Sequence, residues 1–166
     1  MTGQEYAFIV VSVVGVVAAF RLVTARNVVH AALYLVVTLA MVAAAYLLLA
    51  AEFVAWVQIL IYVGAIVILF LFGLMLTKAP IGREALDNQR RAVAFVVGLA
   101  IVAGLVFMIQ DAFPWNGPKI DPAAGTPATV GLSIFSDFVL PFEVISFLLL
   151  AALIGAIVLS RRDDRT

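Results

Sequence analysis

Five long runs of apolar residues, separated by short polar breaks, constrain the fold of this chain more than any other feature. A helix needs roughly 20 apolar residues to cross the hydrocarbon core of a bilayer. Only 12% of the 166 residues are charged, against about a quarter in an ordinary soluble domain. We therefore predict an all-α integral membrane protein, a single membrane domain over 1–166, with five transmembrane helices at about 4–22, 28–50, 53–77, 92–110 and 138–160.

The polar breaks predict how the helices are connected. The longest break, at about 111–137, is rich in proline and glycine, which predicts an irregular loop in water. The break around Glu52 is very short, a two-residue turn between the second and third spans. The chain shows no internal repeat, which argues against an inverted-repeat transporter.

The basic residues predict the orientation. Five spans place nine of the ten Lys and Arg residues on one side of the membrane, and Lys119 alone on the other. Because cytoplasmic segments carry the excess of Lys and Arg, the N-terminus is predicted outside and the C-terminus in the cytoplasm. The nine residues are Arg21, Arg26, Lys78, Arg83, Arg90, Arg91, Arg161, Arg162 and Arg165.

Cysteine and histidine usage limits the chemistry of the chain. There is no cysteine, so neither a disulfide nor a cysteine-ligated iron–sulfur cluster can form. The one histidine, His30, is too few for a bis-histidine haem or a multi-histidine metal site, and we interpret it as hydrogen-bonded locally or facing headgroups. We predict no catalytic residue, no bound metal and no redox cofactor in this chain.

Two acidic residues near the membrane are candidates for function. Glu143 lies about one turn into the fifth span, where it is either an interfacial carboxylate favoured by the helix dipole or an acid facing a partner in a polar pocket. Glu52 lies in the turn before the third span, where it is either solvated or handles protons.

The third span has an unusual set of residues. Helical spacing places one polar and small stripe along it, which is typical of helix–helix interfaces in membranes. Gly64 weakens a regular helix and suggests irregular backbone or a close approach. The length of this span is explained either by tilt or by an extra residue in a π-bulge. The stripe comprises Gln58, Tyr62, Ala65, Leu69 and Gly73.

Three motifs resemble, in order, a known family. Asn27–Ala40 (NVVHAALYLVVTLA), Gln58–Leu76 (QILIYVGAIVILFLFGLML) and Leu140–Leu159 (LPFEVISFLLLAALIGAIVL) are similar to the second, third and fifth helices of subunit J of bacterial NADH:quinone oxidoreductase, or complex I. The mitochondrial counterpart is chain 6. The resemblance covers most of the chain except the first and fourth spans and the long loop.

The resemblance implies a subunit without its own redox centre in the bacterial plasma membrane. Flavin, iron–sulfur clusters and quinone would belong to other subunits, and the neighbours would be subunits A, H, K and N. In the family the third helix carries a π-bulge at the positions of Tyr62 and Gly64, whose switching is thought to gate a water path for protons. Some members have a carboxylate where this chain has Gln58, and since glutamine does not titrate, the resemblance implies gating rather than proton relay at this position.

Two alternative functions remain at this stage. One is the homologous subunit of a multisubunit cation/proton antiporter or of a membrane-bound hydrogenase. The other is a freestanding transporter, which the absence of a repeat disfavours. The electron donor of the whole complex is not encoded in this chain.

Overall fold

The computed structural model describes residues 3–76, 91–113 and 121–161 of the chain. The part that it describes contains five helical stretches that are long and apolar enough to cross a membrane, and it contains no β-strand. The predicted all-α fold and the five predicted spans are thereby confirmed. The observed stretches are Gly3–Thr24, Val28–Leu48, Glu52–Leu76, Val93–Ala112 and Val139–Ser160.

The first two helices form an antiparallel hairpin. α1 (Gly3–Thr24) and α2 (Val28–Leu48) contact each other along their length. The turn between them is closed by Asn27, whose side-chain oxygen accepts a hydrogen bond of 2.8 Å from the backbone N–H of Val29. Small residues allow the helices to approach, and a Cβ built on Gly15 would lie 3.2 Å from the Cβ of Met41.

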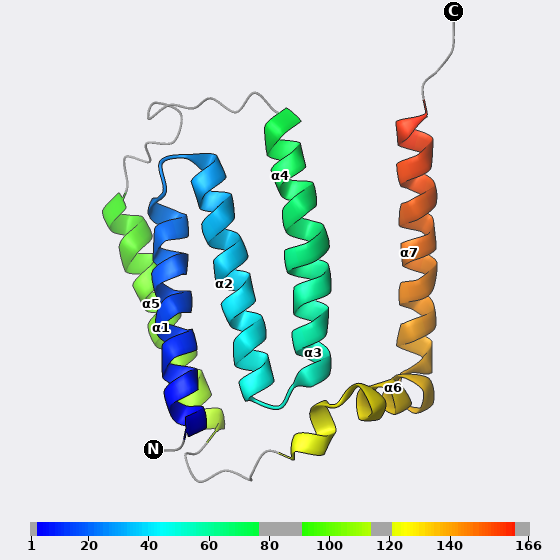
Figure 1. Ribbon diagram of the computed structural model, residues 1–166, viewed down its shortest axis with the longest axis horizontal. Coiled ribbons are helices and arrows are strands. Elements are labelled where there is room, and N and C mark those ends of the chain that lie inside the picture. Colours follow the sequence, from blue (N-terminus) through cyan, green and yellow to red (C-terminus); the bar gives the residue numbers. More distant parts are fainter. Residues whose placement is uncertain (1–2, 77–90, 114–120, 162–166) are drawn as a thin grey trace, which may run out of the picture.

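The third span is composed of three helical segments in continuous succession. These are α3 (Glu52–Val57), the π-helix η1 (Gln58–Ile66) and α4 (Val67–Leu76). All three contact α2, which therefore lies between α1 and the third span (Figure 1). Small residues of α2, Ala32 and Ala43, are almost completely buried in this three-helix layer.

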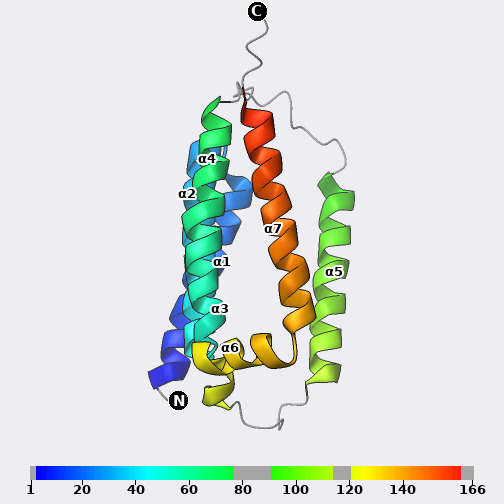
Figure 2. The same ribbon diagram turned by 90° about the vertical axis from the view of Figure 1, so that its right-hand side faces the viewer.

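The last two spans lie apart from this layer. α5 (Arg91–Ala112) contacts none of the other described elements, and α7 (Val139–Ser160) contacts only α6 (Pro127–Ser136). Figures 1 and 2 show α7 joined to the rest of the molecule at one end, through α6. Nearly all side chains of these two spans that the structure describes are exposed within the isolated chain. Their apolar surface is available for lipid or for other subunits.

The segment at about 111–137 corrects the prediction of an irregular loop. It contains the short 3₁₀-helix η3 (Pro122–Gly125) and the ten-residue helix α6, which lies across the ends of the spans (Figure 2). Helix formation has a local cause, because the Thr126 hydroxyl caps α6 and Pro127 occupies its first turn, where a missing N–H costs nothing. Asp121 caps η3 by accepting from the N–H of Ala123 at 2.9 Å.

A tight turn at residues 48–51, here called the α2–α3 corner, connects the second and third spans. The N–H of Ala51 donates to the carbonyl of Tyr46 at 2.9 Å, and the N–H of Ala50 donates to that of Leu47 at 3.1 Å. This pair of bonds is a Schellman motif, with Ala50 at φ 58° in the left-handed position that glycine usually occupies. The side-chain amide of Gln4 also donates to the carbonyl of Leu48, which ties the start of α1 to the corner.

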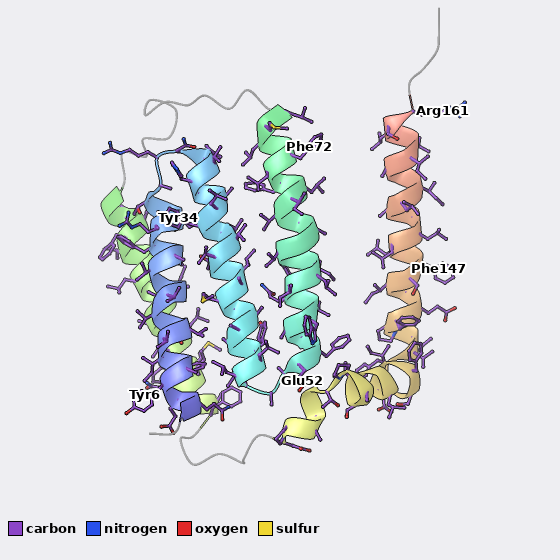
Figure 3. All side chains as sticks on the ribbon, viewed as in Figure 1. Tyr6, Tyr34, Glu52, Phe72, Phe147 and Arg161 are labelled. Carbon is purple, nitrogen blue, oxygen red and sulfur yellow. The ribbon has the colours of Figure 1, made fainter. Side chains whose placement is uncertain are left out.

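The end of α1, whose last turn carries Arg21, and Arg161 at the end of α7 lie on one side of the molecule, and Glu52 lies on the opposite side (Figures 1 and 3). α1 begins on the Glu52 side and α7 ends on the Arg161 side. The predicted outward N-terminus and cytoplasmic C-terminus stay a prediction. Several residues behind that prediction lie outside the described residues: Lys78, Arg83, Arg90, Lys119, Arg162 and Arg165.

Candidate functional site

The π-helix in the middle of the third span is the main irregularity of the fold. It covers nine residues, Gln58–Ile66. At its end the N–H of Val67 donates to the carbonyl of Tyr62, five residues earlier, where a regular α-helix would pair residues four apart. The departure from regular α-helix that the sequence predicts near Tyr62 and Gly64 is present in the structure. It covers nine residues, which is more than the one extra residue of a π-bulge that the sequence analysis weighed against tilt.

The π-helix changes which side chains face α2. Gln58 and Val67 are nine positions apart and both are buried, and the segments that carry them both pack on α2. A regular α-helix turns about 100° per residue, so nine residues would place these side chains on opposite faces. Two full turns over nine residues need about 4.5 residues per turn, which is the wider turn that i→i+5 bonding gives. The wide turns therefore let both residues face α2.

This geometry separates the residues that we predicted to form one stripe. Gln58 is only 8% exposed, whereas Tyr62 is 45% exposed, and Ala65, Leu69 and Gly73 are exposed too. The prediction of a single stripe was wrong because it assumed 100° per residue through a segment that turns less per residue. At about 80° per residue Tyr62 lies about 40° from Gln58, at the edge of the face that packs on α2, whereas Ala65, Leu69 and Gly73 turn away from that face.

Two glycines of the third span have different surroundings. A Cβ built on Gly64 would lie 3.4 Å from the carbonyl oxygen of Ile59, in ordinary van der Waals contact across one wide turn. A Cβ built on Gly73 would meet nothing within 4 Å, and Gly73 lies in α4, beyond the π-helix. Gly64 is therefore the glycine whose substitution bears directly on the π-helix.

The candidate acids occupy separate places on the Glu52 side of the molecule. Glu52 is the first residue of α3 and is exposed, beside the α2–α3 corner (Figure 3). Its carboxylate lies at a helix N-terminus, where the helix dipole favours a negative charge. Glu143 lies in α7, one turn beyond its start, as the sequence predicts. The structure does not bring the two acids into one site.

Glu143 borders an open pocket of about 440 Å³ where α6 meets α7. Aromatic rings dominate its wall, and the rings of Phe135 and Phe142 meet edge-on with their centroids 5.1 Å apart. Among the described residues no basic side chain forms an ion pair with Glu143, because Arg21, Arg26 and Arg161 lie near the far ends of the spans. The lining residues are Phe135, Val139, Phe142, Glu143, Ser146, Phe147 and Leu150.

Sequence reasoning missed the contact between the long loop and the third span. η3 and α6 both contact α3, and Gly125 approaches the α2–α3 corner so closely that a Cβ there would lie 2.9 Å from the Cα of Ala51. The capping residue Thr126 followed by Pro127 is a signal for a helix start that could have revealed α6. No group of three or more His, Cys, Asp or Glu residues that could hold a metal occurs in the described part of the chain.

These features define a class of protein: a multi-pass membrane subunit in which three packed spans carry a π-helix, while two further spans contact no other span among the described residues. The family model for NADH-ubiquinone/plastoquinone oxidoreductase chain 6 matches residues 18–159. The chain belongs to this family.

Relatives from three kinds of organism support the assignment. The chain is 40% identical to NAD(P)H-quinone oxidoreductase chain 6 of Leptolyngbya boryana, covering 96% of this chain and 81% of the relative. It is 39% identical to F(420)H(2) dehydrogenase subunit J of Methanosarcina mazei, covering 96% and 92%. It is 31% identical to NADH-quinone oxidoreductase subunit J of Escherichia coli K12, covering 96% and 88%.

Proposed function

We propose that this chain is a membrane-arm subunit of a proton-translocating quinone oxidoreductase and that its third span gates proton movement in response to quinone reduction. The family supports the first part of the proposal, and bacterial relatives together with five apolar spans support a multi-pass location in the plasma membrane. The observation that carries the second part is the π-helix at Gln58–Ile66.

A π-helix within an α-helical span provides a two-state element. Converting its wide turns to regular turns rotates everything beyond it, because each residue then turns through a larger angle. Gln58 and Val67 would leave their common face, so α4 would turn relative to α2. Such an element opens or closes a path for water if other subunits favour one form in one catalytic state and the other form in the next.

Each candidate residue of the third span has a role in this gate. Gly64 has no side chain to obstruct the change of turn next to the Ile59 carbonyl. Tyr62 is 45% exposed at the edge of the face that packs on α2, and it presents its hydroxyl to water or to a neighbouring helix. Gln58 orients water by hydrogen bonds and carries no proton, and Gly73 leaves room for a neighbour to follow the rotation of α4.

The two acids act through partners. A carboxylate at membrane depth needs a donor, and the described residues offer Glu143 none, so we assign it to the interface with another membrane subunit. Glu52, exposed at the start of α3, remains a candidate for a contact with water at the same side of the complex. Subunits A, H, K and N are the proposed neighbours.

Redox chemistry belongs to other subunits in this proposal. The chain has no cysteine to ligate an iron–sulfur cluster, and we assign the clusters, the flavin and the quinone site to other subunits of the complex. Relatives named for NAD(P)H and for F(420)H(2) match over most of their lengths, which leaves the electron donor open. This chain itself is a non-catalytic subunit.

Maps of the intact complex at rest and during turnover test the gate. We expect i→i+5 bonding through residues 58–66 in one state and regular i→i+4 bonding in the other, with α4 rotated between them. The same hydrogen-bond pattern in every state, whichever pattern it is, would rule out a gate at this span.

A further inference from the structure

The tightest surroundings of any described glycine lie outside the π-helix, where the long loop meets the α2–α3 corner. A Cβ built on Gly125 would lie 2.9 Å from the Cα of Ala51 and closer still to the carbonyl oxygen of Ala50. These are backbone atoms, which cannot rotate out of the way as the end of a side chain does. Only glycine therefore fits at position 125 while the corner keeps its shape.

The corner that receives Gly125 is itself restrained. The Schellman bonds of Ala50 and Ala51 fix its backbone, and alanine in a left-handed conformation has fewer alternatives than glycine would have. Gln4 adds a hydrogen bond from α1 to the carbonyl of Leu48. The first turn of the third span thus starts from a turn that α1, α2 and η3 hold together.

The two ends of the third span are supported unequally. α3 contacts α2, η3, α6 and the π-helix. α4 contacts only α2 and the π-helix, within the described residues. A rotation that begins in the π-helix therefore meets more resistance at α3 than at α4.

The loop also connects the corner to α7. The N–H groups of Asp137 and Phe138 both donate to the carbonyl of Ser133, at 2.9 and 3.1 Å, so α6 turns directly into α7. The edge-on contact of Phe135 with Phe142 braces the same junction. Together η3 and α6, residues 122–136, form a strap from the corner to the start of α7 (Figure 2).

We propose that Gly125 is a positioning residue that seats this strap on the α2–α3 corner, so that α3 stays fixed and the rotation of the gate is confined to α4. The proposal rests on the proposed gating function of the third span. Without the contact between Gly125 and the corner, α3 also rotates, and the far end of α4 rotates less.

Single cysteines in the intact complex test this division of movement. The natural chain has no cysteine, so thiols left unreacted by N-ethylmaleimide can be tagged with a polyethylene-glycol maleimide, and the gel shift of this one chain reports the introduced thiol alone. Val54 of α3 and Leu76 of α4 are both exposed and lie on opposite sides of the π-helix. The rate of reaction with N-ethylmaleimide is measured for each cysteine at rest and during turnover.

With the natural strap we expect the Leu76→Cys rate to change about threefold or more between the two states and the Val54→Cys rate to stay constant. In a Gly125→Ala background the Val54→Cys rate should become state-dependent by a similar factor, while quinone-linked pumping falls. Gly131→Ala is the matched control, because a Cβ at that glycine of α6 would meet nothing within 4 Å. It should leave both rates as they are in the natural chain.

Should Gly125→Ala prevent assembly, Thr126→Val removes the hydroxyl that bonds Ala123 and caps α6, without adding volume at the corner. It should change the Val54→Cys rate in the same direction. A state-independent Val54→Cys rate in both strap variants would overturn the positioning role, and so would a state-dependent rate with the natural strap. A Leu76→Cys rate that is the same in both states would overturn the gate itself, and the positioning role with it.

Discussion

Replacing Gly64 by valine perturbs the π-helix where the span approaches its own backbone. A Cβ at this position would lie 3.4 Å from the carbonyl oxygen of Ile59, an ordinary contact, so alanine fits without displacement. Valine adds two methyl groups to that Cβ, and branched side chains have one strongly preferred χ1 in a helix. The methyl groups therefore crowd the wide turn, and alanine does not.

The magnitude follows from the cost of overpacking. Extra methyl groups in a well-packed position cost about 1–3 kcal/mol, and Gly64 is exposed with one backbone neighbour, so the lower part of this range applies. Because the crowding arises against the wide turn, we expect about 1–2 kcal/mol to act against the π form, a factor of about 5–30 in the ratio of the π form to the regular form. Intrinsic helix propensity contributes little to this difference, since both forms are helical.

The assay compares three activities of the intact complex. With Gly64→Val, electron transfer to quinone and proton pumping should fall by about 5- to 30-fold, while reduction of a water-soluble acceptor by the peripheral subunits stays unchanged. Gly64→Ala, the matched control, should stay within about twofold of the natural chain because its Cβ fits. A Gly64→Val complex that assembles and pumps as well as Gly64→Ala would refute the reasoning.

Three further predictions concern topology, the interface and the corner. Cysteines at the exposed residues Ala124 and Arg161 should react with a membrane-impermeant thiol reagent from opposite sides of the membrane. Reaction of both from the same side would contradict the predicted topology. Glu143→Gln should lower coupled activity or assembly about threefold more than Glu52→Gln, since the deeper carboxylate depends more on a partner. Equal effects would favour the alternative, in which Glu143 is a carboxylate at the membrane–water interface. Ala50→Gly should stabilise the folded chain by about 1 kcal/mol, because glycine adopts the left-handed conformation without strain. The inactivation temperature of the complex should therefore rise, and a lowered one would contradict this.

The five spans were predictable because the signal for a membrane helix is local. A run of about 20 apolar residues must be helical in lipid whatever lies beside it. The π-helix was predictable in position, near Tyr62 and Gly64, but its length was not. The length of the π-helix depends on which residues pack on α2. Gln58 and Val67 are both buried, and this tertiary packing cannot be predicted from a periodicity of 100° per residue.

The corner and the strap were not predictable in the same way. The sequence LLLAAEF contains no glycine to mark the left-handed position that Ala50 adopts. α6 had a capping signal in Thr126 and Pro127, but the proline and glycine content around it favoured a loop. The close approach of Gly125 to the corner is a long-range contact between segments about 75 positions apart, and no local sequence pattern predicts it.

The exposed face of the third span determines where the energy for gating must come from. Tyr62, Leu69 and Met75 are 45%, 72% and 76% exposed within the isolated chain, so other subunits or lipid cover them in the membrane. Lipid provides no directional contacts and so distinguishes the two forms of the span weakly. A partner can shift the equilibrium only by the difference between its interactions with the two forms. The bias that gates the path therefore belongs to the interface with neighbouring subunits, and a substitution in a neighbour that contacts Tyr62 should change turnover and pumping together, as Gly64→Val does.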